Sequence, residues 1–180
     1  MNLNKLAVLL TISLFNTNVS ALESDFKQPI NVSSVEQFAS LKTNTIVFTK
    51  EVLLTQGSIK ITADKLTIIR GKKANHETMI AEGNDATFYQ TQADGRPLDA
   101  KAKRIVYDVE NGKITLTTSA QVKQLDSQVS GAKIVYFLDS QELNVSTDQN
   151  KKERVKTVFL PAQFEKDKTQ SKSSSTTEEK

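Results

Sequence analysis

The sequence predicts an all-β protein built from short antiparallel strands. From residue 28 to about residue 160, apolar and polar residues alternate in short runs, as they do on strands that bury one face. Turn signals interrupt these runs at intervals of about eight to twelve residues, a spacing typical of sandwiches, jelly rolls and rolls. No window has a sustained helical period, apart from one possible helical turn between Val35 and Leu41.

The first clear strands lie between Thr45 and Ile69. Alternation there predicts three short strands, with a turn at Gly57-Ser58 before the third. In the third strand the apolar phase slips by one residue after Ala63. A slip moves all later side chains to the other face unless a bulge absorbs it, so we expect this strand to bend near Asp64-Lys65.

The same phase slip recurs along the chain. A small residue, two intervening residues and an apolar residue occur at 63–66, 102–105 and 131–134, with a weaker copy starting at Ser34. The copies are separated by 63 − 34 = 29, 102 − 63 = 39 and 131 − 102 = 29 residues. Repeats of this length are typical of arrays in which each unit buries its apolar face against its neighbours. A chance coincidence of short strand patterns is the alternative, and the shared slip favours a real repeat.

Two further signals define later strands. Asn111-Gly112, between the alternating residues 107–109 and 114–116, is the most distinct hairpin signal in the chain. Residues Val155 to Leu160 predict a final strand, which Pro161 ends. If the sheet stays open, its first and last strands are unpaired and can pair with another chain.

The two ends of the sequence differ in composition from its middle. Residues 1–21 combine Lys5, a short apolar run at 6–15 and small residues before Ala21, which predicts a secretory signal peptide cleaved after about Ala21. Residues 22–160 form the predicted domain, and the polar residues 161–180 predict a disordered tail. The chain has no cysteine, so an exported domain would be stabilised by its core rather than by disulfides.

The residue types argue against catalysis. The single histidine, His76, lies in a polar loop without a recognisable partner, and no nucleophile motif accompanies it. We therefore expect no enzyme activity, no metal site and no cofactor. With 24 basic and 21 acidic residues the charge is nearly balanced, which argues against nucleic-acid binding. The basic clusters are either a solvated outer face or the rim of a groove that meets an anionic ligand such as a phosphorylated lipid.

The apolar faces leave two possibilities open. If the sheet closes on itself, the inward apolar residues are core, and if it stays open they line a trough suited to acyl chains. Composition does not decide between these. The residues concerned are Ile30, Val32, Phe48, Leu54, Ile59, Ile61, Phe88 and Tyr107.

Several motifs together resemble a known family. They are TQGSIKI-x-ADK at residues 55–65, ATFYQ at 86–90, and Gln28-Pro29-Ile30-x-Val32, with further similarity through 124–136 and 152–158. This combination closely resembles the LptA, or OstA-like, family of periplasmic lipopolysaccharide-transport proteins of Gram-negative bacteria. The resemblance covers essentially the whole predicted domain, and it departs from the family pattern in the loop from Arg70 to Thr78 and in the Lys-rich tail.

The resemblance implies a fold, a ligand and partners. The fold would be an open antiparallel β-jellyroll, a folded, V-shaped stack of strands with an apolar inside. Lipopolysaccharide would travel with its acyl chains in this groove, between an LptC-like inner-membrane partner at the N-terminal edge and an LptD-like outer-membrane partner at the C-terminal edge. Copies would join head to tail in the periplasm.

The same resemblance, with the alternation described above, gives candidate site residues. The predicted lipid-binding groove consists of Ile30, Val32, Phe48, Leu54, Ile59, Ile61, Phe88, Tyr107 and Val109. The predicted partner and oligomer edges consist of Ile30, Asn31, Val32, Ser33, Val155, Thr157, Val158 and Phe159. The alternatives to a transport bridge are a freely diffusing periplasmic lipid chaperone and a non-catalytic β scaffold.

Overall fold

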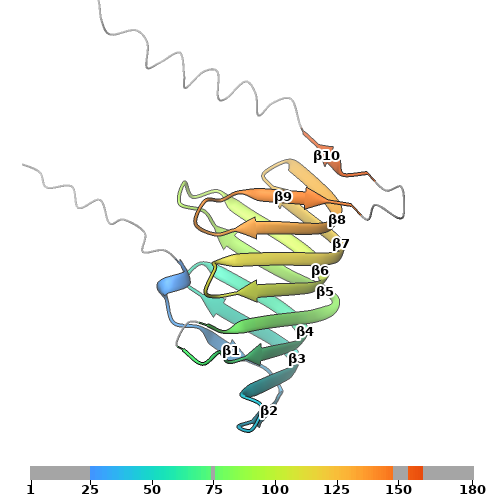
Figure 1. The fold of residues 1–180 in the computed structure, drawn as a ribbon. Helices are drawn as coiled ribbons and strands as arrows, with labels where there is room; N and C mark the ends of the chain where they lie inside the picture. Colours follow the sequence, from blue (N-terminus) through green and yellow to red (C-terminus); the bar gives the residue numbers. More distant parts are fainter. Residues whose placement is uncertain (1–24, 74–75, 148–153, 160–180) are drawn as a thin grey trace, which may run out of the picture.

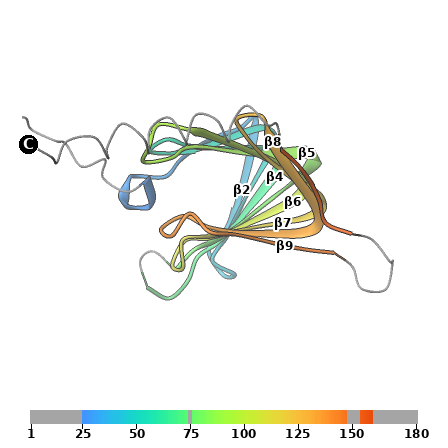
Figure 2. The same cartoon turned by 90° about the horizontal axis from the view of Figure 1, so that it is seen from above.

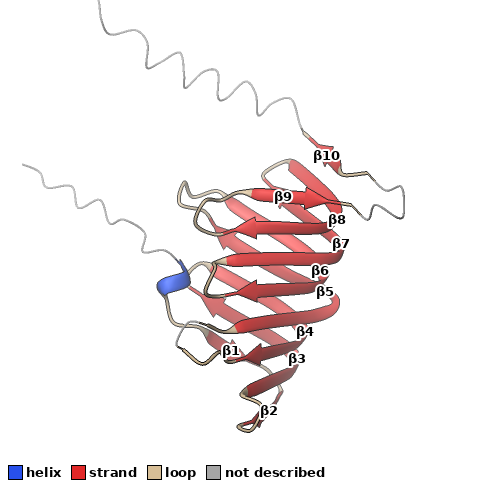
Figure 3. Cartoon of the chain, viewed as in Figure 1, coloured by secondary structure: helices blue, strands red, loops and turns tan. Residues whose placement is uncertain are grey.

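The computed structural model describes residues 25–73, 76–147 and 154–159, and these residues form a single stack of strands after one short 3₁₀ helix (Figures 1 and 3). The elements are η1 (Asp25–Lys27), β1 (Asn31–Ser33), β2 (Glu36–Ser40), β3 (Thr45–Gln56), β4 (Ile59–Ile69), β5 (Thr78–Thr91), β6 (Pro97–Asp108), β7 (Lys113–Gln124), β8 (Ser127–Phe137), β9 (Leu143–Ser146) and β10 (Lys156–Val158). The all-β prediction is confirmed.

All neighbouring strands are antiparallel, and they form one 10-stranded sheet in the order β1-β3-β4-β5-β6-β7-β8-β10. At the N-terminal end, β1 and β2 pair with opposite halves of β3. At the C-terminal end, β10 and β9 pair with opposite halves of β8. Each end of the stack therefore carries two short strands instead of one long strand.

Each strand from β3 to β8 bends in its middle, where the pairing register shifts. The bends lie side by side and divide the sheet into two arms that are joined along one side (Figure 2). We call arm 1 the half that begins with β1 and ends with β10, and arm 2 the half that begins with β2 and ends with β9. The open side of the V, opposite the bends, is called the mouth. The predicted slips at 63–66, 102–105 and 131–134 coincide with register shifts in β4, β6 and β8, which confirms them.

The bends keep one face apolar along the whole strand. In β7, Ile114 and Leu116 are buried before the bend, and Ala120 and Val122 are buried after it. The intervening Thr118 and Ser119 have φ of 63° and 59°, so the strand turns there while the same alternate positions stay on its inner face. Inner faces of both arms thereby pack together as one core. Its largest fully buried apolar and aromatic side chains are Tyr107, Tyr136, Phe88, Leu54, Ile59, Leu66, Ile105, Ile114, Leu116 and Ile134.

Three local predictions need correction or completion. The possible helical turn at 35–41 is instead the extended strand β2, because its backbone pairs with β3. The first two short strands predicted after Thr45 are one strand, β3, bent at Lys50 and Glu51, whose φ values are 66° and 53°. The predicted hairpin at Asn111-Gly112 is confirmed between β6 and β7.

The predicted signal peptide at residues 1–21 and the predicted tail at residues 161–180 lie outside the described residues. Within the described part of the chain, no helix is long and apolar enough to cross a membrane. The final predicted strand is present as β10, paired with Gln128, Val129 and Ser130 of β8.

Replacing Thr118 with Gly tests whether the bends carry backbone strain. A left-handed backbone costs a residue with a side chain about 1–2 kcal/mol, which Gly avoids. We expect Thr118→Gly to raise the free energy of unfolding in urea or to leave it within about 0.5 kcal/mol, because relief of strain offsets the added flexibility of Gly. Thr115→Gly, in the straight part of the same strand, should lower it by about 1 kcal/mol. Equal losses in the two variants would contradict a strained bend.

Candidate functional site

The predicted groove residues all lie on or against the interior between the arms. Phe48, Leu54, Ile59, Ile61, Phe88, Tyr107 and Val109 are buried, whereas Ile30 and Val32 are partly buried and pack against the same core. Contacts cross from one arm to the other, and the rings of Phe88 and Tyr136 meet edge to face with centroids 6.2 Å apart. Of the two possibilities left open by the sequence, these residues form core in this structure, because the arms are closed.

A cavity of about 290 Å³ opens the interior at the C-terminal end of the stack. Leu98 and Val122 of arm 1 form part of its wall, and Leu143 of arm 2 lies in the same lining. Phe159, after β10, also borders it. This is a place in the described chain where the apolar interior is accessible without any movement of the arms.

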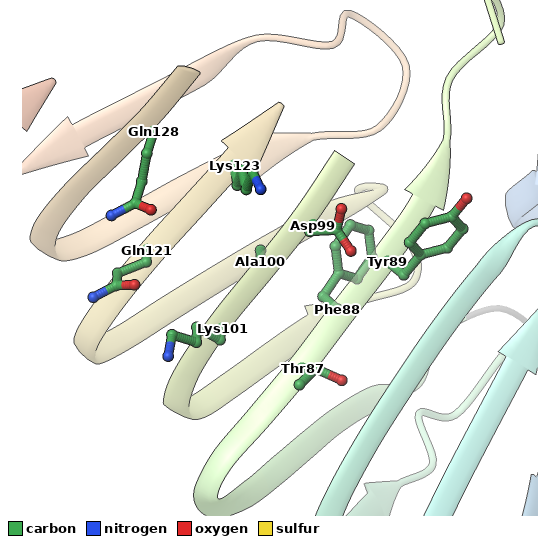
Figure 4. Close-up of a pocket in the computed structure, with 9 residues that line it drawn as sticks. All are labelled: Thr87, Phe88, Tyr89, Asp99, Ala100, Lys101, Gln121, Lys123 and Gln128. Atoms are coloured by element: carbon green, nitrogen blue, oxygen red, sulfur yellow. The ribbon is translucent and has the colours of Figure 1, made fainter. Parts of the chain in front are cut away.

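A second hollow, of about 340 Å³, lies on the outer face of arm 1. Its lining comes from neighbouring strands β5 to β8, and Figure 4 shows Lys101 and Lys123 there beside Gln121. Tyr89 belongs to the same hollow, and the Lys60 ammonium lies 5.9 Å from the centre of its ring. The lining of the outer hollow includes charged side chains, whereas the lining of the cavity between the arms includes none.

A row of amides and phenols crosses the mouth, and we call it the polar row. Its amides are at the last inward positions of β3, β5 and β7 and just beyond β5, and its phenols are near the ends of β6 and β8. Three of these amides are among the most buried polar groups of the described chain, with exposed fractions of 2% for Gln56, 6% for Gln90 and 5% for Gln92. The polar row consists of Gln56, Gln90, Gln92, Gln124, Tyr107 and Tyr136.

Three hydrogen bonds of the polar row join the arms. The Tyr107 hydroxyl of arm 2 donates to Gln56 Oε1 of arm 1 at 2.8 Å. The Tyr136 hydroxyl donates to Gln90 Oε1 at 3.1 Å, and it accepts from Gln92 Nε2 at 3.3 Å. Gln124 Nε2 in turn donates to Gln92 Oε1. Each tyrosine thus reaches an amide three strands earlier in the chain, so the same contact occurs twice.

Burial keeps both phenols neutral. Loss of solvation raises the pKa of Tyr107 far above its ordinary value, and the Asp25 carboxylate nearby adds to the effect. Burial likewise raises the pKa of Tyr136, although the hydrogen bond from Gln92 partly opposes it. Both hydroxyls therefore remain protonated donors throughout the physiological pH range.

Helix η1 lies at the mouth and caps the polar row (Figure 2). Asp25 accepts hydrogen bonds from the Ser58 backbone N–H at 2.7 Å, from Ser58 Oγ at 2.7 Å and from Gln90 Nε2 at 2.9 Å. Just after η1, the Gln28 carbonyl accepts from Gln56 Nε2 at 3.0 Å. The turn Gly57-Ser58 permits this approach, since a Cβ on Gly57 would lie 2.4 Å from Asp25 Oδ1.

The sequence analysis did not identify the polar row, although the sequence contains a signal for it. The glutamines at the ends of β3, β5 and β7 are separated by 90 − 56 = 34 and 124 − 90 = 34 residues. This period is close to that of the bends. Glutamine next to a turn is also a common surface residue, so the period is informative only when the strands are known to be stacked.

The predicted edge residues lie at the two ends of the stack (Figure 1). Asn31, Val32 and Ser33 form β1, at the N-terminal end. Residues 155–159 include β10, at the C-terminal end. Both short strands belong to arm 1, so this arm has an outward-facing backbone edge at each end.

His76 has a partner that the sequence did not predict. Its Nε2 lies 3.1 Å from the Glu110 carboxylate, in the loops at the mouth. This surface pair contains no nucleophile. Within the described residues, no group of three or more histidine and acidic side chains is arranged to hold a metal ion.

Replacing Gly57 with Ala tests the contact between Asp25 of η1 and the turn at Gly57-Ser58. The new methyl group would collide with Asp25, and the φ of +57° would be strained. The matched control is Gly95→Ala, where φ is +81° but nothing lies within 4 Å of the added atom. We expect Gly57→Ala to lower the free energy of unfolding in urea by about 1 kcal/mol more than Gly95→Ala, the net value of a hydrogen bond to Asp25. Equal losses would show that Asp25 does not depend on this turn.

Comparison with known proteins assigns the chain to a family. Residues 31–142 match the family described as LptA/(LptD N-terminal domain) LPS transport protein. The chain is 40% identical over 167 residues to the lipopolysaccharide export system protein LptA of Haemophilus influenzae, covering 92% of this chain and 96% of that protein. It is 35% identical to LptA of Escherichia coli K12, over 90% of this chain and 89% of that protein.

A solved structure has the same fold. The crystal structure of LptH from Pseudomonas aeruginosa, described as the LptA homologous periplasmic component of the lipopolysaccharide transport device, matches with a TM-score of 0.70 and 27% identity. The match covers 77% of this chain and 100% of that chain. The bent antiparallel stack, the matched residues and the relatives together show that the chain belongs to the family of LptA and LptD N-terminal-domain lipopolysaccharide transport proteins.

Proposed function

We propose that this protein is a non-enzymatic periplasmic carrier that binds lipopolysaccharide and bridges inner- and outer-membrane assemblies. The observation that carries the proposal is a stack with a continuous apolar interior and, at both ends, short edge strands whose outer side has no neighbouring strand among the described residues. The names of its relatives support the same ligand, since they are lipopolysaccharide export proteins. Signal-peptide cleavage after about Ala21 would deliver the chain to the periplasm.

Acyl chains would lie between the arms, in contact with the predicted groove residues. Each methylene moved from water to this interior contributes roughly 0.8 kcal/mol. Because Leu54, Ile59 and Tyr107 are fully buried in the closed arrangement, the arms must separate for a chain to run along the whole stack. The cavity beside Leu143 and Phe159 gives a starting point for this separation.

The two ends would bind the partners by adding strands. An unpaired strand edge is a template for another strand, and both ends of arm 1 present one. Large apolar side chains are exposed at the same ends of the stack: Val35, Phe38 and Leu41 in or next to β2, and Val155, Val158 and Phe159 in or next to β10. An LptC-like protein would bind the β1 end, an LptD-like protein would bind the β10 end, and copies would join head to tail.

The exposed ends favour a bridge over a freely diffusing lipid chaperone. A chaperone that carries one lipid has no use for two open strand edges, which natural proteins usually protect. A non-catalytic β scaffold would use the edges but would make no contact with lipid through its interior. Contact of lipid with the inner face therefore distinguishes a carrier from a scaffold, and use of the strand edges distinguishes a bridge from a chaperone.

Photo-crosslinking in intact cells tests lipid transport between the arms. A photoreactive residue at Phe88, on the inner face, should form an adduct with lipopolysaccharide, because the acyl chains would pass that position. The same probe at Lys60, exposed on the outer face of β4, is the matched control and should form little or none. Absence of adducts at both positions, with both variants present at the normal level, would contradict the proposal.

Disrupting β10 tests the bridge. Thr157→Pro removes a backbone donor from a strand of three residues, whereas Thr157→Ala leaves the backbone intact. We expect the wild type and Thr157→Ala to form longer assemblies as concentration rises in sedimentation experiments, and Thr157→Pro to remain smaller. A wild type that stays monomeric at all concentrations, and that does not bind partner domains, would support the chaperone instead.

A further inference from the structure

The polar row lies at one depth, between the apolar interior and the mouth. The residue two positions before each glutamine at a strand end is apolar and buried: Leu54, Phe88 and Val122. On the outer side of the row lie the turns of the mouth and η1. A molecule that places apolar chains in the interior and a polar part outside must cross this depth.

The chemistry of the polar row is uncharged. Its amides each offer a donor and an acceptor, and its two phenols are held in their protonated form by burial. In the closed arrangement these groups bind one another and Asp25. Because buried polar groups require partners, separation of the arms leaves Tyr107 and Tyr136 in need of replacement hydrogen bonds.

The C-terminal cavity already brings the polar row together with apolar walls. Gln92, Gln124 and Tyr136 line this cavity, and the apolar Leu98 and Leu143 belong to the same lining. A ligand in this cavity can therefore contact apolar and uncharged polar groups at the same time. Three of the six members of the row take part, and they are joined to each other by the hydrogen bonds described above.

We propose that the polar row is a subsite for the uncharged carbonyl, amide and hydroxyl groups through which acyl chains are attached to a sugar. The inference rests on the proposed function, since acyl chains between the arms place their attachment point at this depth. Amides and phenols bind such groups by exchanging hydrogen bonds, whereas phosphate is bound by Arg and Lys, which are absent from the row. The polar row thus selects acylated sugars over lipids that lack these carbonyl groups. As the arms separate, its amides and phenols exchange their hydrogen bonds to one another for hydrogen bonds to the ligand.

Two soluble probes of matched chain length test the subsite. The first is an N-acylglucosamine, which carries an amide at the attachment point, and the second is an alkyl glucoside, which carries a glycosidic oxygen and no carbonyl there. Both are used below their micelle concentrations with the full-length mature protein. Because both probes carry the same apolar chain, any cost of separating the arms cancels in the ratio of their dissociation constants.

The variants are Tyr136→Phe and Gln90→Met, which delete the hydrogen-bonding groups with little change of shape. The control is Tyr89→Phe, the same deletion on the outer face of arm 1. In the wild type and in Tyr89→Phe we expect the N-acylglucosamine to bind more tightly. In Tyr136→Phe and Gln90→Met the preference should fall about tenfold, the value of one buried hydrogen bond. Thermal unfolding shows whether each variant is folded. If Tyr136→Phe or Gln90→Met fails to fold, the other variant alone is sufficient to test the subsite.

The outcomes separate this inference from the proposed function. If both dissociation constants change by the same factor and the preference stays constant, the polar row is only a latch between the arms and the subsite is overturned. If the wild type binds both probes equally, the subsite is overturned while lipid binding stands. If the wild type binds neither probe nor lipopolysaccharide, the proposed function itself fails.

Discussion

The architecture depends on a bend at the middle of every long strand. In β4, β5, β6 and β8 the apolar phase slips at the bend, so a straight strand would turn half of the apolar residues to solvent, because side chains alternate with a period of two. In β7 the apolar phase does not slip, and the left-handed residues Thr118 and Ser119 turn the chain between inward-facing Leu116 and Ala120. Since neighbouring strands bend at matching positions, the bends form one continuous line and the sheet folds into two arms. The common interior, the mouth and the paired short strands at the ends all follow from that line.

The polar row is the second consequence of the folded sheet. Where two arms meet at an open side, some groups near the solvent must be polar, and those that become buried must find partners across the gap. A buried hydrogen bond contributes about 0.5–1.5 kcal/mol net, whereas an unpaired buried group costs about 1–3 kcal/mol. The Gln56–Tyr107 and Gln90–Tyr136 contacts therefore stabilise closure modestly, and they penalise any opening in which nothing replaces them. This asymmetry favours a ligand that carries its own donors and acceptors to the mouth.

Alternation and turn chemistry predicted most of the fold, but not the state of the arms. The bends in β4, β6 and β8 were visible because a small residue precedes a slip in apolar phase. Those in β3 and β7 were missed because left-handed residues such as Lys50 turn the strand without a slip in the apolar phase. The bend in β5 was missed because four residues separate its buried Ala81 from its buried Ala86. Closure was beyond sequence reasoning for a physical reason: an apolar face looks the same whether it meets the other arm or an acyl chain. The polar row was missed because its period has meaning only once β3, β5 and β7 are known to lie in register.

The repetition along the stack also limits what the fold can do in transport. Successive strands offer similar apolar surface, and the two cross-arm contacts have the same chemistry at two levels. On the proposed function, an acyl chain moving along the interior exchanges one site for another of nearly equal affinity. Equal sites permit gradual movement but give it no direction, because a ligand shifts an equilibrium only by its difference in affinity between two states. Direction must therefore enter at the ends, where β1 and β2 differ from β9, β10 and the cavity beside them, and where a partner supplies or removes the ligand.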